Sequence, residues 1–375
     1  MFEKKKILRR LRFQGILSAI LLASAALIYL LAGNWHFFAL GIYGPFSRVV
    51  SGFLGLIFSA VPFSVVEILL CGLILGCAVY FFTAAVKTFH PQKRLALLRW
   101  IGDTVICLAA IFFLFTLFWG GCYLAPKLEE RMGLDVRPRP EETLADTARW
   151  LLGQLKEEAA AVTRDQNGVT DGGGFAALAA KMPACVEALR DENPELYGGG
   201  LVSPPQRPLL SDLMSYAGIG GIYIPITGEC HVNGNMADSD LPSCMAHEMA
   251  HRLGCAPEED ANFVAYLACM KSQYPEIRYS GVKSAFFYCL SAIDNDEIYG
   301  QLVREIPDGV WTDIAHAANL GKRFEGPLQD SMTDMSSSMN DAYLQALGQE
   351  GGIKSYGRVT DLLIAYYVSL HGEGG

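Results

Sequence analysis

Three long apolar segments in the first third of the chain limit most strongly what it can fold into. They cover residues of about 15–33, 63–86 and 101–123, and the second and third carry a single charged residue each. A helix rises about 1.5 Å per residue, so each segment is long enough to cross a hydrocarbon core of about 30 Å. We therefore predict a membrane domain over residues 1–123 with three transmembrane helices.

The segment between the first two spans, residues 45–62, is apolar but contains Arg48 and ends at Pro62. Because proline interrupts helices, we predict an interfacial or re-entrant helix here and regard a fourth span as the weaker alternative. The first span could instead be a cleavable signal peptide. Two further spans follow, however, and no small-residue cleavage site stands out, which favours an uncleaved anchor.

Basic residues in the short loops predict the orientation. The N-terminal tail holds six Lys and Arg, and four more lie between the second and third spans, whereas the loop between the first two spans has only Arg48. Basic loops stay on the cytoplasmic side. The sequence therefore predicts a multi-pass membrane protein with a cytoplasmic N-terminus and an extracytoplasmic C-terminal domain.

The remaining two thirds are acidic. The whole chain has 30 Lys and Arg against 39 Asp and Glu, and residues 1–122 hold 11 and 3 of these, which leaves 19 and 36 for the rest. Such a domain repels phosphate, so a nucleic-acid partner is excluded. A purely cytosolic single domain is excluded as well. The predicted partners are the lipid bilayer and molecules outside the cell.

The outer domain is predicted to be mainly helical. Residues 124–141 form a proline-containing linker, and helices follow at about 142–160 and 175–190. Residues 218–229 have the glycine-bounded, β-favouring composition of a strand, and Pro225 places that strand at an edge. From residue 240 onward the pattern is helical, with one long helix expected at 280–304. The fold class is therefore mainly α, with a small β-hairpin or sheet.

The strongest chemical signal is the HExxH sequence at residues 247–251. Positions i and i+4 share one face of a helix, so His247 and His251 can reach the same ion at about 2.0–2.1 Å. Glu248 lies beside that ion without being a ligand. It is therefore placed to take a proton from a metal-bound water molecule. Two ordinary hydrogen-bonded histidines on a helix face are the alternative.

A second helix is predicted to complete the site. Gly254 suits the end of the first helix and Pro257 the start of the next. Glu258 would then be the third metal ligand, with Glu259 as the alternative, and Asn262 one turn later could orient a ligand histidine. Three protein ligands leave a fourth position for water, which is typical of catalytic zinc.

Other residues offer competing interpretations. Cys244 precedes His247 by three residues, so a closed Cys/His zinc site is the weaker alternative, because it leaves Glu248 without a role. His231 is expected to be a surface histidine in a turn. Seven of the ten cysteines face the predicted outside, where disulfides are permitted: Cys122 at the end of the third span and six in the outer domain. The sequence does not decide between a disulfide that joins Cys230 to Cys244 and a set of free buried thiols.

These motifs resemble known families. HExxH followed by E-x-x-A-N resembles the gluzincin zinc metallopeptidases. The stretches 118–128, 221–233, 247–269 and 340–367 are together similar to an uncharacterised family of bacterial membrane proteins that is labelled only as a domain of unknown function. The sequence departs from that family's pattern at Cys230, His231 and Asp260.

The resemblance implies that residues 142–375 form a gluzincin-like zinc metallopeptidase domain. In such enzymes an edge strand beside the metal helix holds the substrate backbone, and Ile222, Tyr223 and Ile224 occupy that strand here. The reaction also needs a donor for the developing oxyanion. The candidates for that donor are Tyr279, Tyr343, Tyr356 and Arg358, among which the sequence does not choose.

We therefore predict a membrane-anchored zinc-dependent metallopeptidase that acts on a peptide or protein substrate near the membrane surface. Zn²⁺ would be held by His247, His251 and Glu258. The alternative is a catalytically silent membrane-anchored envelope protein with a structural or vestigial metal site. Proteolysis inside the membrane is disfavoured because HExxH lies in a charged, soluble region. Substrate preference and oligomeric state are not readable from the sequence.

Overall fold

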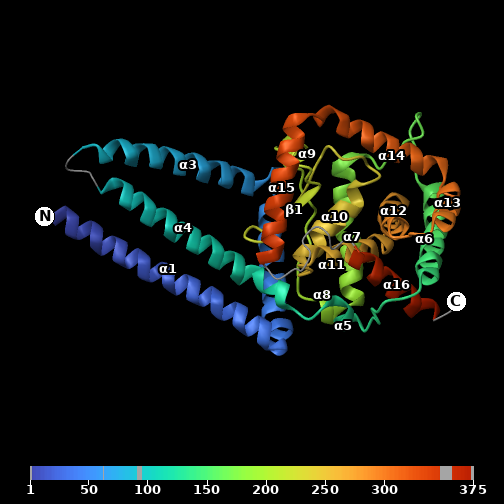
Figure 1. Ribbon diagram of the computed structural model, residues 1–375, viewed down its shortest axis with the longest axis horizontal. Helices are drawn as coiled ribbons and strands as arrows, with labels where there is room; N and C mark the ends of the chain where they lie inside the picture. Colours follow the sequence, from blue (N-terminus) through green and yellow to red (C-terminus); the bar gives the residue numbers. More distant parts are fainter. Residues whose placement is uncertain (1, 62, 91–94, 347–356, 373–375) are drawn as a thin grey trace.

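We analysed a computed structural model of the chain, which describes residues 2–61, 63–90, 95–346 and 357–372. Its first part contains four long apolar helices: α1 (Phe2–Asn34), α2 (Gly44–Phe58), α3 (Val65–Thr88) and α4 (Ala96–Phe118). Helices α1, α3 and α4 pack side by side and extend away from a helical outer domain (Figure 1). The predicted division into apolar N-terminal helices and a mainly helical remainder is therefore confirmed.

The number of apolar helices differs from the expectation of three. Four stretches are long and apolar enough to cross a membrane, and the additional one covers Phe38–Phe58. Pro45 does not interrupt this stretch, because it lies in the first turn of α2, where a proline costs no hydrogen bond. A short π-helix, Phe38–Tyr43, precedes it directly.

Helix α2 differs from the other three in its surroundings. It runs across the ends of α1, α3 and α4, along the outer domain (Figure 1). A third of its most apolar window is buried, whereas none of the corresponding window of α3 is. Gly52 meets the outer domain so closely that a Cβ atom there would lie 2.5 Å from the backbone nitrogen of Leu201. The interfacial position of this segment stays a prediction.

The outer domain is built from helices around α10, which packs against α7, α11 and α12. Its core includes the fully buried aromatic side chains of Tyr197, Phe263 and Phe286. The helix expected at 280–304 is two helices, because Asn295 caps the start of the second. The helices of this domain are α5 (Leu128–Met132), α6 (Glu141–Ala161), α7 (Gly174–Glu192), α8 (Pro194–Tyr197), α9 (Ser211–Tyr216), α10 (Leu241–Arg252), α11 (Glu258–Met270), α12 (Pro275–Ser291), α13 (Asp296–Arg304), α14 (Asp308–Gly321), α15 (Pro327–Ala346) and α16 (Gly357–His371).

The predicted hairpin is present. Strands β1 (Gly221–Ile224) and β2 (Glu229–Val232) pair antiparallel, with Gly221 opposite Val232. On its other side β2 is bridged by Gln206. Among the described residues β1 therefore has a strand partner on one side only, as Pro225 at its end predicts. Helix α10 contacts both strands of the hairpin.

Two buried or half-buried carboxylates join the apolar N-terminal helices to the outer domain. Glu229 of β2 accepts hydrogen bonds from the backbone N–H groups of Val65 and Val66, at 2.8 and 3.1 Å. Glu67 of α3 in turn accepts from Leu209 and Leu210 at the start of α9, at 2.8 and 2.9 Å. Glu229 thus occupies the N-terminus of α3, where negative charge is favourable. The hairpin is thus fixed to the start of α3.

Candidate metal centre

The turn between α10 and α11 brings the HExxH motif of α10 and Glu258 of α11 together in space. Helix α10 ends before Gly254, whose φ of 90° lies in the left-handed region that glycine adopts readily. Pro257 then stands directly before the first residue of α11. Both positions are as the sequence predicts. The chain reverses within a few residues, and α11 packs against α10.

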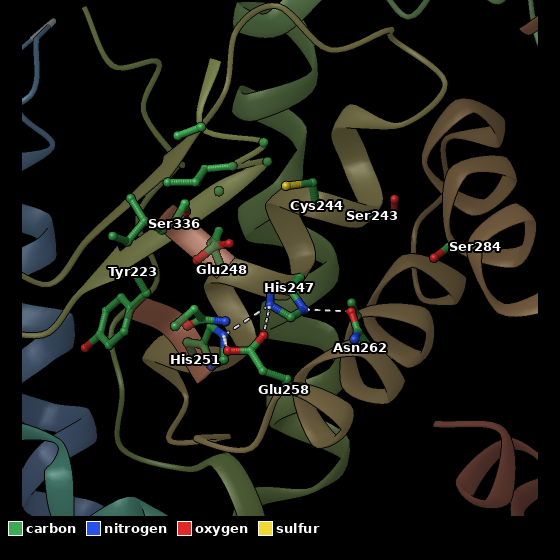
Figure 2. A pocket seen from close by; sticks show the side chains of 18 of the residues that line it. Tyr223, Ser243, Cys244, His247, Glu248, His251, Glu258, Asn262, Ser284 and Ser336 are labelled. Atoms are coloured by element: carbon green, nitrogen blue, oxygen red, sulfur yellow. Dashed lines mark hydrogen bonds and ion pairs between the residues drawn. The ribbon is translucent and has the colours of Figure 1, made fainter. Parts of the chain in front are cut away.

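His247, His251 and Glu258 converge on one point (Figure 2). The Nε2 atoms of the two histidines lie 3.1 Å apart. Glu258 places Oε2 3.2 Å from His247 Nε2 and Oε1 3.7 Å from His251 Nε2. Ligand atoms at about 2.1 Å from a tetrahedral zinc ion lie roughly 3.3 Å from one another. The three separations fit a divalent ion of this size.

The other ring nitrogen of each histidine is engaged. Nδ1 of His247 lies 2.8 Å from Oδ1 of Asn262, and Nδ1 of His251 lies 2.7 Å from the carbonyl oxygen of Cys255. If each oxygen accepts a proton from Nδ1, the neutral rings present the Nε2 lone pairs to the centre. Two Nε2 lone pairs and the Glu258 carboxylate then face one another, and a bound cation would be coordinated by all three. The donor set therefore fits zinc.

Charges near the centre shift its pKa values in the metal-free protein. Burial disfavours the protonated form of His251, but the nearby carboxylates, chiefly that of Glu258, outweigh it and raise its pKa to about 9. Burial also acts against ionised Glu258, yet the two histidines hold the pKa of that carboxyl well below its usual range. Without a metal, the group is thus an ion pair in which a proton takes the place of the cation.

Glu248 lies beside this group and outside it. Its side chain is 4% exposed and lines the same cleft as the two histidines. Burial raises its pKa above the ordinary value, while the histidines partly oppose the shift. Gly221 of β1 makes room for it, since a Cβ atom at that position would lie 2.3 Å from Glu248 Oε1. The strand therefore backs directly onto the Glu248 carboxyl.

The centre opens into a cleft of about 780 Å³. Strand β1 forms one wall, with Ile222 45% exposed and Tyr223 buried. Helix α15 contributes Ser336 and Ser337. The predicted edge strand thus borders the same cleft as the metal centre, which leaves room for an extended peptide beside it.

The predicted oxyanion donors do not gather here. The hydroxyl of Tyr279 is fully buried and donates to Asp313 Oδ2 at 2.6 Å. Arg358 donates to Glu129 Oε2 at 2.6 Å. Neither lines the cleft, because each is drawn to a carboxylate elsewhere in the domain. Tyr356 and the side chain of Tyr343 lie outside the described residues.

Two expectations about neighbouring residues are settled by the packing. His231 is not on the surface: it lies within β2, 2% exposed, with Nε2 3.7 Å from Glu229 Oε1. Cys244 lines the cleft but does not join the His-His-Glu group. All ten cysteines are free thiols. Cys230 donates to the carbonyl oxygen of Glu248 at 3.2 Å instead of forming a bridge.

Three aromatic residues of the cleft were not expected from the sequence. Phe115, Trp119 and Tyr123, at and just after the end of α4, line it together with the metal centre. The indole Nε1 of Trp119 donates to the carbonyl oxygen of His251 at 3.2 Å. Their signal in the sequence is the aromatic cluster at the end of the third apolar segment, which hydropathy alone assigns to the membrane.

Fold and site together define a class of protein: a mainly helical chain with four apolar N-terminal helices and a His-His-Glu group that could hold a metal ion. Residues 41–364 match the family described as "Protein of unknown function (DUF3810)", and the chain belongs to this family. No curated protein and no solved structure matches the chain. The resemblance to an uncharacterised family is thereby confirmed, and that family carries no assigned activity.

Proposed function

We propose that the protein is a membrane-anchored zinc metallopeptidase that hydrolyses peptide bonds. The observation that carries the proposal is the convergence of His247, His251 and Glu258 at the base of an open cleft, with the Glu248 carboxyl beside them. A closed structural zinc site has four protein ligands. Here Cys244 stands apart from the group, so a zinc ion held by His247, His251 and Glu258 would keep room for water at the cleft.

The residues of the chain divide the work of hydrolysis. A bound zinc ion supplies Lewis acidity, which polarises a carbonyl group and acidifies water. Glu248 accepts a proton from the attacking water and returns it to the leaving amine. A buried carboxyl whose pKa is raised is suited to both steps. The free edge of β1 pairs with the substrate backbone and holds the scissile bond over Glu248.

The location of the site belongs to the same proposal. The basic N-terminal tail lies in the cytoplasm and the metal centre lies outside the bacterial cell membrane. The substrate is a peptide or protein close to the membrane surface. Four helices that are long and apolar enough to span a membrane support the anchoring.

Zinc analysis of the purified full-length protein tests the proposal together with digestion of a peptide library. We expect about one zinc ion per chain in the wild type and a loss of zinc in His251→Ala. Glu248→Gln should keep the zinc and abolish turnover. Hydrolysis that persists in Glu248→Gln would contradict the mechanism. Zinc without any hydrolysis in the wild type would favour the alternative, a catalytically silent envelope protein with a vestigial metal site.

A further inference from the structure

One wall of the cleft belongs to the membrane helices. We call Phe115, Trp119 and Tyr123 the aromatic wall. All three line the cleft that contains the metal centre. Trp119 is 5% exposed and stands edge-on to the rings of His251 and Tyr223, with centroid distances of 5.8 and 5.6 Å. The aromatic wall is therefore in direct contact with one metal-ligand candidate and with the edge strand.

The length of α4 places this wall at the bilayer boundary. Its 23 residues correspond to about 34 Å of helix, close to the thickness of a hydrocarbon core. Phe115 lies in the last turn of α4, and Trp119 and Tyr123 follow within two turns. Tryptophan and tyrosine are enriched at that depth. The cleft thus reaches the plane where the hydrocarbon ends.

The wall is held at this depth by the junction between the domains. Glu229, on the strand paired with β1, accepts two N–H groups at the start of α3. Gly55 of α2 meets the backbone of Gly228 so closely that an added Cβ atom would lie 2.6 Å from its carbonyl oxygen. The hairpin therefore cannot rise from the membrane helices without breaking these contacts.

The cleft is also polar on its far side. Ser243 and Ser284 line it, and Figure 2 shows them on the opposite side of His247 from Tyr223. Tyr223 is the strand residue that contacts Trp119. Ser336 of α15 lies near Tyr223 in the same view, and Tyr288, one turn after Ser284, also lines the cleft. A peptide lying along the cleft thus meets the aromatic wall at the end next to α4 and hydroxyl groups along the rest of its length. A polypeptide that leaves a bilayer likewise changes from apolar to polar along its length.

We propose that the substrate is a membrane-inserted polypeptide that is cut within a few residues of its own apolar span. The inference rests on the proposed peptidase function. The aromatic wall binds the apolar residue nearest the bilayer and determines specificity, while β1 pairs with the extended segment that follows. Hydrolysis breaks the C–N bond and adds the oxygen of water to the carbonyl carbon. The proton passes through Glu248 to the amine.

Spacer length tests this directly. The full-length protein is reconstituted in vesicles with substrates that carry one cleavable sequence at about 3, 10 or 30 residues from a transmembrane helix. We expect the shortest spacer to be cleaved at least tenfold faster than the longest. Equal rates for all spacers would overturn the inference and leave the peptidase proposal intact.

Substitution of the wall gives a second test. Phe115→Ala should raise KM for the short-spacer substrate about tenfold, with kcat and zinc content little changed, because an apolar contact made before the reaction is lost. The matched control is Phe112→Ala on the same helix, which removes an exposed ring outside the cleft. An equal rise of KM in both variants would count against a binding role for Phe115.

A third readout does not depend on turnover. A photoreactive residue in place of Phe115, in a Glu248→Gln background, should capture the short-spacer substrate at the residue next to its span. Capture of the long-spacer substrate to the same extent would overturn the inference. Failure of the peptidase proposal would show separately, as hydrolysis that is absent for every substrate in wild-type protein.

Discussion

At the scale of single residues, the orientation of the two histidine rings depends on the partners of their Nδ1 atoms as well as on the groups near their Nε2 atoms. Asn262 and the Cys255 carbonyl hold the Nδ1 atoms at 2.8 and 2.7 Å, so both Nε2 atoms turn toward Glu258. Such outer partners fix the ring orientation and support metal affinity. The Asn262 side chain can be removed without touching a ligand atom.

Asn262→Ala should weaken zinc binding by about 10- to 100-fold, because the ring of His247 loses the bond that orients it. Competition with a chelator of known affinity measures the change. The matched control is Cys244→Ser, which changes a cleft residue one turn before His247. Zinc affinity should be retained in that control, and its loss would revive the closed Cys/His site.

Zinc binding should also depend on pH. In the metal-free protein His251 has a pKa of about 9, above its ordinary 6.5. The stabilisation that its protonated ring gives is therefore complete below pH 6.5 and is lost as the pH rises through 9. Zinc must displace this proton. Its apparent affinity should rise by up to about tenfold per pH unit from pH 7 to 9, and a flat profile in chelator competition would contradict the assignment.

At the scale of elements, the site is a strand laid against a helix. Gly221 of β1 allows the strand to approach Glu248 of α10, whereas its neighbour Gly220 has ordinary contacts. A side chain at Gly221 would displace the carboxyl from the cleft. The position of Glu248, the proposed general base, therefore depends on a residue that has no side chain of its own.

Gly221→Ala should lower kcat by up to about 100-fold, since displacement of a catalytic group by about 1 Å can have that effect. Zinc content should be unchanged, because no ligand moves. Gly220→Ala is the matched control: its added Cβ atom would lie 3.5 Å from Cys244 Sγ, an ordinary contact. Both variants are assayed on one peptide substrate and their kcat values are compared. Equal values would refute the role of Gly221.

The elements also show which parts of the site were predictable. His247 and His251 are one helical turn apart, and Gly254 and Pro257 mark the reversal that brings Glu258 back, so local spacing was sufficient. Tyr279 and Arg358 do not line the cleft, because their distant partners Asp313 and Glu129 determine where the two side chains point. Hydropathy identified the apolar segments. It could not show that α2 would turn along the outer domain.

At the scale of the whole molecule, the apolar helices and the outer domain exchange carboxylate contacts. Glu229 of the outer domain accepts from the first two N–H groups of α3, and Glu67 of α3 accepts from Leu209 and Leu210 just before α9. Glu229 is fully buried, and His231 helps to keep its pKa below the ordinary value although burial acts in the other direction. The junction is therefore a charged contact that neither part can complete alone.

Glu229→Ala should lower the free energy of unfolding by about 1–3 kcal/mol, because it leaves the N–H groups of Val65 and Val66 without their acceptor. Thermal unfolding of the protein in nanodiscs measures this as a lower Tm. Glu305→Ala removes an exposed carboxylate paired with Lys156 at 2.6 Å and should change stability by less than about 0.5 kcal/mol. A Tm for Glu229→Ala equal to that of this control would refute the role of the junction.

The contacts of Glu229 and Glu67 limit how the chain can be divided, in the laboratory or in evolution. A fragment that begins after α4 would carry Glu229 with no helix to cap and would leave the start of α9 open. A foreign membrane anchor joined to this domain would lack the Glu67 carboxylate. It would also lack Gly52 and Gly55 of α2, which allow close contact with the outer domain. The apolar helices and the domain that holds the metal centre should therefore be inherited together. A version without the helices would require a redesigned surface where the hairpin and α9 meet them.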